Sequence, residues 1–243
     1  MHIKPMYNDI VYIVGRESRW DDMELKYSLR SVEKHCINWS GRVFIIGHKP
    51  RFIHNVIHIP ASDAHKNKAR NIMEKVLIAA SSDDVSENFM LLNDDYFLRK
   101  PVDVTNYPYW HKCDLARTMD INKTEYYFHV KATFDMLKYL ERPILNFDTH
   151  CPIIYNKEKF RDLVKNFNWD IPHGYILRSM YCNIYGLNDG YKEDCKVSRP
   201  LGPQYWDEYT KNADCFSIGD SAITGGFMKF MEQEYPEKSR FEV

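Results

Sequence analysis

The stretch that decides the fold is Phe89-Met-Leu-Leu-Asn-Asp-Asp-Tyr-Phe-Leu98, in which two apolar runs enclose three polar residues. The first apolar run is typical of a buried strand. Ligand sites in open α/β sheets lie beyond the carboxyl ends of the strands, so Asn93, Asp94 and Asp95 stand where a site is expected. Adjacent carboxylates are costly to hold together unless a cation neutralises them, and Mg²⁺ and Mn²⁺ take carboxylate oxygens. We therefore predict Asp94 and Asp95 as metal ligands, with an ordinary acidic turn as the alternative.

The residues before this stretch alternate between short apolar runs and amphipathic segments. Apolar runs over residues 9–14, 42–47 and 55–59 predict three further buried strands. Apolar residues at helical spacing predict helices over residues 22–36 and 62–80. The order strand, helix, strand, strand, helix, strand builds a mostly parallel sheet, so we predict an α/β fold.

After Pro101 the pattern weakens. Helices are expected near residues 131–140, 157–167, 174–185 and 227–234, separated by Pro-, Gly- and aromatic-rich turns. The predicted fold class is thus α/β, with a mostly parallel central sheet and a helical, loop-rich C-terminal half.

Composition limits the classes of function. The chain has 243 residues, 33 Lys+Arg against 34 Asp+Glu and 44% hydrophobic residues. These values exclude a disordered, collagen-like or coiled-coil chain. A net charge of −1 argues against binding nucleic acid through a global basic field, although it permits a local basic groove.

Three further features predict a cytoplasmic location. No segment approaches the ~18 apolar residues that a membrane helix requires. Residues 1–8 are polar and lead straight into a strand, which is unlike a signal peptide. The six cysteines lie far apart with no CxxC pair, so free thiols in a reducing cytosol are favoured over a zinc site or a disulfide framework.

Several motifs resemble conserved blocks of the Stealth family. They are Asp9-Ile-Val-Tyr12, Glu24 to Lys34, Leu92-Asn-Asp-Asp-Tyr-Phe-Leu98, Phe147-Asp-Thr-His-Cys-Pro152 and Lys157-Glu-Lys-Phe160. Stealth enzymes are sugar-1-phosphate transferases of bacterial capsule synthesis, related to the animal lysosomal-enzyme phosphotransferase, with a core like the GT-A glycosyltransferases. The resemblance therefore implies a GT-A-like, Rossmann-like fold, a nucleotide-sugar donor such as a UDP-sugar, and a divalent cation, Mn²⁺ or Mg²⁺.

Two details refine this resemblance. The closing Pro236-Glu-Lys-Ser-Arg-Phe-Glu242 resembles the C-terminal motif of small Stealth-related or GT-A-like transferases of bacteria and phages. The family's first block usually continues as Trp-Val-Asp-Gly, whereas this chain continues Ile13-Val-Gly-Arg-Glu17 and lacks that acidic residue. We therefore favour transfer of the sugar itself over transfer of a sugar 1-phosphate.

Donor-binding candidates follow from position and charge. A glycine after the first strand lets the backbone approach a base or a phosphate closely. The unpaired N–H groups at a helix start favour anions. Asn67, Asn71 and Lys75 recur at four-residue spacing and so are predicted to share one helix face. Basic residues near the C-terminus suit phosphate if the tail folds back over the site; solvated charges are the alternative reading. The candidates are Gly15, Arg16, Asp63, Asn67, Lys68, Asn71, Lys75, Asn93, Lys238, Ser239 and Arg240.

Candidates for catalysis and acceptor binding come from the second half. An imidazole suits removal of a proton from an acceptor hydroxyl, and the Stealth resemblance at Asp148-Thr-His150 favours His150 as that base. Asp148 is an alternative base or the residue that orients the histidine, and Asp95 completes the candidate catalytic set. Aromatic rings can stack on a sugar or a base, with ordinary core packing as the alternative. Acceptor-binding candidates are Tyr109, Trp110, His173, Arg178 and Asp220.

These observations predict one transferase domain over residues 1–243, with a nucleotide-sugar and metal half (1–100) and an acceptor-side half (101–243). The predicted activity is metal-dependent transfer of a sugar from a nucleotide sugar to a hydroxyl of a glycan. The Lys-, Asn-, Ile- and Tyr-rich composition is typical of AT-rich genomes, including those of phages. A hydroxymethylated DNA base is therefore a second acceptor candidate, and a phage-encoded enzyme would act in the host cytoplasm. A Stealth-type sugar-1-phosphate transferase acting on a polysaccharide, and an inactive nucleotide- or glycan-binding module, remain alternatives.

Overall fold

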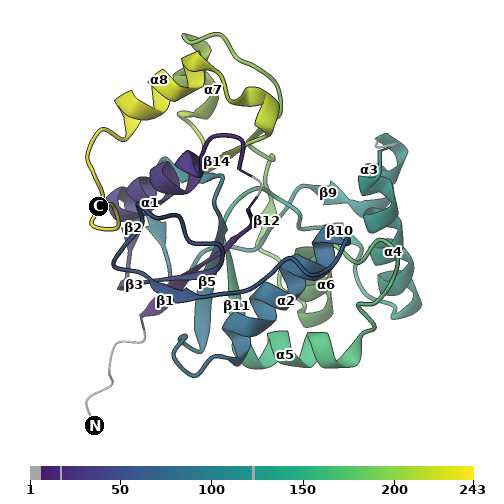
Figure 1. The fold of residues 1–243 in the computed structure, drawn as a ribbon. Helices are drawn as coiled ribbons and strands as arrows, with labels where there is room; N and C mark the ends of the chain where they lie inside the picture. Colours follow the sequence, from purple (N-terminus) through teal and green to yellow (C-terminus); the bar gives the residue numbers. More distant parts are fainter. Residues whose placement is uncertain (1–6, 17, 122–123) are drawn as a thin grey trace.

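The computed structural model describes residues 7–16, 18–121 and 124–243 (Figure 1). Its centre is a five-stranded sheet with the order β11-β5-β1-β3-β4. Four of its strands are parallel: β1 (Asn8–Val14), β3 (Trp39–Gly47), β4 (Ile57–Ile59) and β5 (Asn88–Asn93). The edge strand β11 (Ile153–Asn156) pairs antiparallel with β5. The predicted α/β fold with a mostly parallel central sheet is confirmed.

Helices cover both faces of this sheet, which explains why its strands are apolar throughout. Successive side chains of a strand point to opposite faces. Accordingly Val11 packs in the cluster that contains α2 (Lys68–Ser81), whereas Tyr12 packs in the cluster that contains α1 (Met23–His35). The carboxyl ends of β1 and β5 lie side by side, with Ile13 of β1 opposite Asn93 of β5. Whatever follows these two strands is therefore brought together.

The start of α2 differs from the sequence prediction. The helix begins at Lys68 rather than near Ser62 and Asp63, because the side chain of Asn67 is its cap. Asn67 Oδ1 accepts hydrogen bonds from the backbone N–H groups of Ala69 (3.0 Å) and Arg70 (3.3 Å). Asp63 consequently lies in the loop between β4 and α2.

The second half of the chain is helical and loop-rich, as predicted. Its helices are α3 (Leu115–Ile121), α4 (Tyr126–Tyr139), α5 (Lys157–Asn166), α6 (Leu177–Tyr185), α7 (Tyr205–Thr210) and α8 (Gly225–Glu234). The helix predicted near 131–140 begins five residues earlier, as α4. None of the helices in the described residues is long and apolar enough to cross a membrane.

A second sheet connects the acidic stretch to this half. It pairs β6 (Tyr96–Leu98) with β14 (Cys215–Ile218), which in turn pairs with β13 (Lys196–Val197). Two-residue pairs complete the described sheets: β2 (Cys36–Ile37) with β7 (Val102–Asp103), β8 (Trp110–His111) with β12 (Gly190–Tyr191), and β9 (Cys113–Asp114) with β10 (Leu145–Asn146). In Figure 1, α7 and α8 lie on the side of α1, and α3 and α4 lie at the opposite side of the molecule.

Candidate functional site

Two adjacent aspartates form the turn that joins β5 to β6. Burial, with the nearby negative charges of Asp95 and Glu24, raises the pKa of Asp94 to about 7. Glu24 lies in the first turn of α1, and its own pKa is raised by burial and by the charges of Asp22 and Asp95. The carboxyl end of the central sheet therefore holds a concentration of negative charge. We refer to Asp94 and Asp95 as the acidic turn.

The acidic turn suits a divalent cation whose coordination shell is completed by a bound ligand. The main charges acting on Asp94 are all negative. Within the described part of the chain, no group of three or more His, Cys, Asp or Glu side chains is arranged to hold a metal by itself. Mg²⁺ is commonly bound through one or two carboxylates, with water and substrate phosphates filling its other positions. Two adjacent carboxylates, without a full set of protein ligands around them in the described residues, match that chemistry.

The end of β1 is held by a buried lysine. Lys75 Nζ donates to the backbone oxygen of Val14 (3.1 Å) and to Asp63 Oδ1 (2.6 Å). Gly47, at the end of β3, has a φ of +117°, and a Cβ atom there would lie 2.1 Å from the Val14 oxygen. Only glycine fits this close approach. Lys75 and Asp63 are thus an ion pair beside Gly15, and the Asp63 side chain remains 41% exposed.

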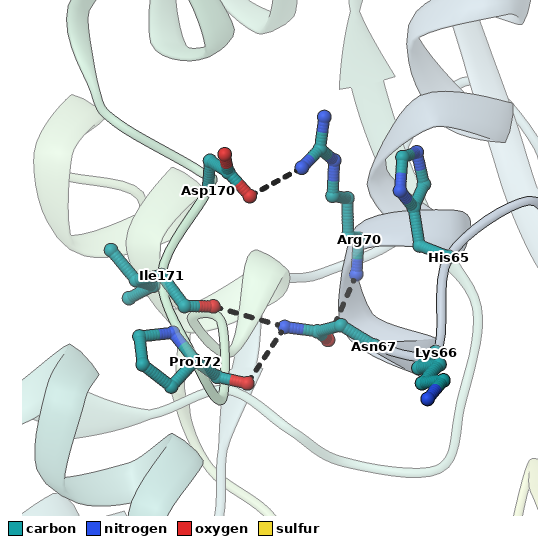
Figure 2. A pocket seen from close by; sticks show the side chains of 7 residues that line it. All are labelled: His65, Lys66, Asn67, Arg70, Asp170, Ile171 and Pro172. Carbon is teal, nitrogen blue, oxygen red and sulfur yellow. Dashed lines mark hydrogen bonds and ion pairs between the residues drawn. The ribbon is translucent and has the colours of Figure 1, made fainter.

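Two predicted donor-binding asparagines have structural partners. Asn71 exchanges two hydrogen bonds with the backbone of His65 (2.9 and 2.7 Å), which fixes the loop before α2. Asn67 caps α2 and also donates to the backbone oxygens of Ile171 and Pro172 (Figure 2). The shared helix face predicted for Asn67, Asn71 and Lys75 is therefore wrong for Asn67, because that residue precedes the helix.

A pocket of about 410 Å³ lies beside the start of α2 (Figure 2). Its charged groups are largely paired, since Arg70 contacts both Asp170 (2.5 Å) and Glu74 (3.1 Å). Lys68, the first residue of the helix, is exposed. The pocket is lined by His65, Lys66, Asn67, Arg70, Asp170, Ile171 and Pro172.

The remaining donor-binding candidates lie in two places. Arg16 is exposed just after β1, and Asn93 is half-buried at the end of β5. The C-terminal tail lies elsewhere: Arg240 pairs with Glu33 in the last turns of α1. Because each helical residue adds about 1.5 Å, that position is more than a full turn from Glu24 and the acidic turn.

Contacts within the tail explain where it lies. The buried Ser239 donates hydrogen bonds to Glu242, and Lys238 donates to the backbone oxygen of Val243 (3.3 Å). Glu242 in turn accepts two hydrogen bonds from Arg30 of α1, both 2.7 Å. The tail packs along α1, so the condition under which Lys238, Ser239 and Arg240 would bind phosphate, that the tail folds back over the acidic turn, is not met.

A second polar cluster surrounds His150. Its Nδ1 lies 2.9 and 3.0 Å from the two oxygens of Asp194, and its Nε2 lies 3.1 Å from Lys196 Nζ. Burial alone would raise the pKa of Asp194, but the hydrogen bonds from His150 and the charge of Lys112 lower it well below its usual range. Asp148, half-buried nearby, accepts a hydrogen bond from the hydroxyl of Tyr126 (2.7 Å).

The small second sheet joins the His150 cluster to the acidic turn. Ser217 of β14 donates a hydrogen bond to Asp95 Oδ2 (2.9 Å), and its partner residue on β13 is Lys196. Paired residues on neighbouring strands are about 4.8 Å apart. Asp95, Ser217, Lys196 and His150 therefore form a continuous series of neighbours between the two polar groups.

Sequence reasoning did not find Glu24, Asp194, Lys196 or Ser217. Glu24 belongs to a motif quoted for the Stealth resemblance, so that motif was a usable signal for it. The other three lie 44 or more residues from the groups that they contact, in turn-rich sequence without periodicity.

The acceptor-binding candidates occupy three separate environments. Arg178 is buried and donates to the backbone oxygens of Thr149 (2.9 Å) and Cys151 (2.6 Å), while its second terminal nitrogen has no hydrogen-bond partner among the described residues. Tyr109 and Trp110 line a small cavity together with Arg178. This group lies directly beside the Asp148–His150 segment.

His173 and Asp220 have other neighbours. The ring of His173 stacks on Phe128 at 4.6 Å. Asp220 pairs with Arg19 at 3.1 Å, and both side chains are exposed. The side-chain contacts of these two residues in the structure are thus with Phe128, His129 and Arg19.

Comparison with known proteins places the fold. No family model and no curated protein sequence matches the chain, so the Stealth resemblance stays a prediction. Among solved structures, the chain is similar to the galactosyltransferase LgtC in complex with donor and acceptor sugar analogs, with a TM-score of 0.53. The match covers 96% of this chain and 98% of that one, at 11% sequence identity. The chain has a GT-A-like fold. At this identity the similarity establishes the fold alone.

Proposed function

We propose that the chain is a glycosyltransferase that takes a sugar from a nucleotide sugar, with a UDP-sugar as the expected donor. The observation that carries this proposal is the acidic turn at the carboxyl end of the central sheet, where burial and neighbouring carboxylates raise the pKa of Asp94 to about 7. This arrangement disfavours the ionised form of Asp94 in the metal-free protein. A divalent cation at the turn during function would account for keeping these carboxylates together.

In the proposed site Asp94 and Asp95 would hold Mg²⁺ or Mn²⁺, which would offset the negative charge of the donor phosphates when bound. Lys75, Asp63 and Gly15 shape the neighbouring end of β1, where the rest of the nucleotide would lie. The acceptor oxygen attacks the anomeric carbon and the bond from that carbon to the phosphate oxygen breaks. The acceptor proton goes to Asp148 or His150, and a nucleoside diphosphate leaves.

Alternative chemistries use the same groups. Attack of the acceptor on the β-phosphate would transfer a sugar 1-phosphate and release a nucleoside monophosphate, as the Stealth resemblance implies. A glycan hydroxyl is the acceptor that we favour, with a hydroxymethylated DNA base as the second candidate. An inactive nucleotide- or glycan-binding module would not need the acidic turn.

The test is ³¹P NMR of the purified protein with a panel of nucleotide sugars, in Mg²⁺ or in chelator. We expect slow, Mg²⁺-dependent release of a nucleoside diphosphate even without acceptor. Asp94→Asn and Asp95→Asn should each reduce this release by about a hundredfold or more. The matched control is Asp83→Asn, an exposed aspartate outside the site, which should behave as wild type.

The products separate the alternatives. Release of a nucleoside monophosphate would show that the enzyme transfers a sugar 1-phosphate and not the sugar alone. Binding of a nucleotide without turnover, unaffected by Asp94→Asn, would favour the binding module. Absence of both binding and turnover across the panel would refute the proposed function.

A further inference from the structure

Three side chains form an ordered series of hydrogen bonds beside the acidic turn. Asp194 accepts from both the backbone N–H (3.0 Å) and the Nδ1 of His150 (2.9 Å). With the proton on Nδ1, the Nε2 nitrogen is an acceptor, and Lys196 Nζ lies 3.1 Å from it. Asp194 therefore fixes the tautomer of His150, and His150 in turn holds the lysine ammonium.

This geometry is poorly suited to His150 as the base. Both ring nitrogens are already engaged, so Nε2 could take an acceptor proton only after Lys196 had moved away. The carboxylate of Asp148 is less obstructed, since the Tyr126 hydroxyl donates to one of its oxygens, Oδ2, and leaves lone pairs for a further proton. Of the two base candidates, the contacts favour Asp148.

Lys196 is linked to the acidic turn through one neighbour, Ser217. It lies next to Ser217 in the β13–β14 pair, and Ser217 contacts Asp95. The stem of Lys196 lies beside Gly219, where a Cβ atom would be 3.9 Å from the Cε of the lysine, an ordinary contact distance. Within the described residues Lys196 forms no ion pair with a carboxylate, because Asp194 pairs instead with His150 and Lys112.

We propose that Lys196 binds a phosphate oxygen of the donor's diphosphate, and that His150 and Asp194 are positioning residues that hold its ammonium in place. This inference rests on the proposed function, since it requires a nucleotide diphosphate at the acidic turn. A fixed ammonium at that place stabilises the charge that develops on the leaving phosphate. The charged groups around His150, which holds this ammonium, are Asp194, Lys112 and Asp148, with Arg178 behind the same segment.

The experiment is calorimetric titration of the full chain with UDP and with uridine, in the presence of Mg²⁺. Lys196→Gln should weaken UDP binding by about tenfold to a hundredfold and leave uridine binding unchanged, because only UDP carries the phosphates. Lys196→Arg should restore much of the UDP affinity. The control Lys229→Gln removes an exposed lysine of α8 and should bind UDP like wild type.

The positioning residues give a second readout. His150→Gln and Asp194→Asn should also weaken UDP binding, whereas loss of a base would lower turnover and leave UDP affinity intact. Circular dichroism checks that each variant is folded, and His150→Gln and Asp194→Asn carry the test if Lys196→Gln does not fold. Unchanged UDP affinity in the folded Lys196→Gln and His150→Gln variants would overturn the inference while the proposed function stood. If wild type binds neither UDP nor any other nucleoside diphosphate, both proposals fail.

Discussion

Replacing Asp94 by asparagine should stabilise the metal-free protein at neutral pH. The pKa of Asp94 is raised from 3.8 to about 7, mainly by burial and by the charge of Asp95. Between these two values the folded chain holds a proton that the unfolded chain has lost, so the free energy of unfolding falls as the pH rises. Each pKa unit corresponds to about 1.36 kcal/mol, which gives a loss of up to about 4 kcal/mol in wild type. The asparagine side chain of the variant does not titrate, so the variant escapes this loss.

The assay is urea unfolding in chelator at a series of pH values. The stability advantage of Asp94→Asn should grow between about pH 4 and pH 7 and then level off. Adding Mg²⁺ with UDP should narrow the gap, because a ligand that binds only the folded wild type stabilises it. Asp83→Asn should show no pH-dependent advantage. An Asp94→Asn protein that is no more stable than wild type at about pH 8 without metal would refute the reasoning.

Three further predictions concern the framework of the site. Gly47→Ala should cost about 2–5 kcal/mol in urea unfolding, because its Cβ would lie 2.1 Å from a β1 backbone oxygen; Gly186→Ala, with φ +65° and no atom within 4 Å, should cost only about 1–2 kcal/mol. Asn67→Ala should remove the α2 cap and cost about 1 kcal/mol in the same assay. Burial would raise the pKa of Glu242, but hydrogen bonds from Arg30 lower it below 4.5. The stability cost of Glu242→Gln should therefore be full near neutral pH and shrink as the pH falls below about 4.5, and an undiminished cost in acid would contradict this pairing.

The central sheet could be predicted because its signal is local. Val11 and Tyr12 pack on opposite faces of β1, and both faces are covered by helices, so every residue of the strand is apolar or buried. The acidic turn could be predicted for the same reason, since two aspartates interrupt an otherwise apolar run. These features need no knowledge of distant contacts.

The start of α2 could not be predicted from local sequence. Ser62, Asp63 and Asn67 are all good capping residues. The structure uses Asn67, whose amide also donates to the backbone oxygens of Ile171 and Pro172, more than 100 residues away. That tertiary contact decides among equivalent local choices.

The His150 cluster shows a similar limit. His150 could be singled out through the Stealth resemblance, but its partners Asp194 and Lys196 lie 44 and 46 residues along the chain. Their sequence, Lys-Glu-Asp-Cys-Lys, has the composition of a solvated turn. The role of this segment follows only from the pairing of β13 with β14. Because β13 has only two residues, no periodic pattern in the sequence predicts it.

The most direct test of the central claim is to measure Mn²⁺ binding at the acidic turn by electron paramagnetic resonance, with UDP present. The account predicts that wild type and the exposed-site control Asp83→Asn reduce the free Mn²⁺ signal at one equivalent, and that Asp94→Asn and Asp95→Asn do not. Equal Mn²⁺ binding by all four proteins, or none by wild type in the presence of UDP or the other nucleoside diphosphates, would contradict a metal-assisted nucleotide site at these carboxylates.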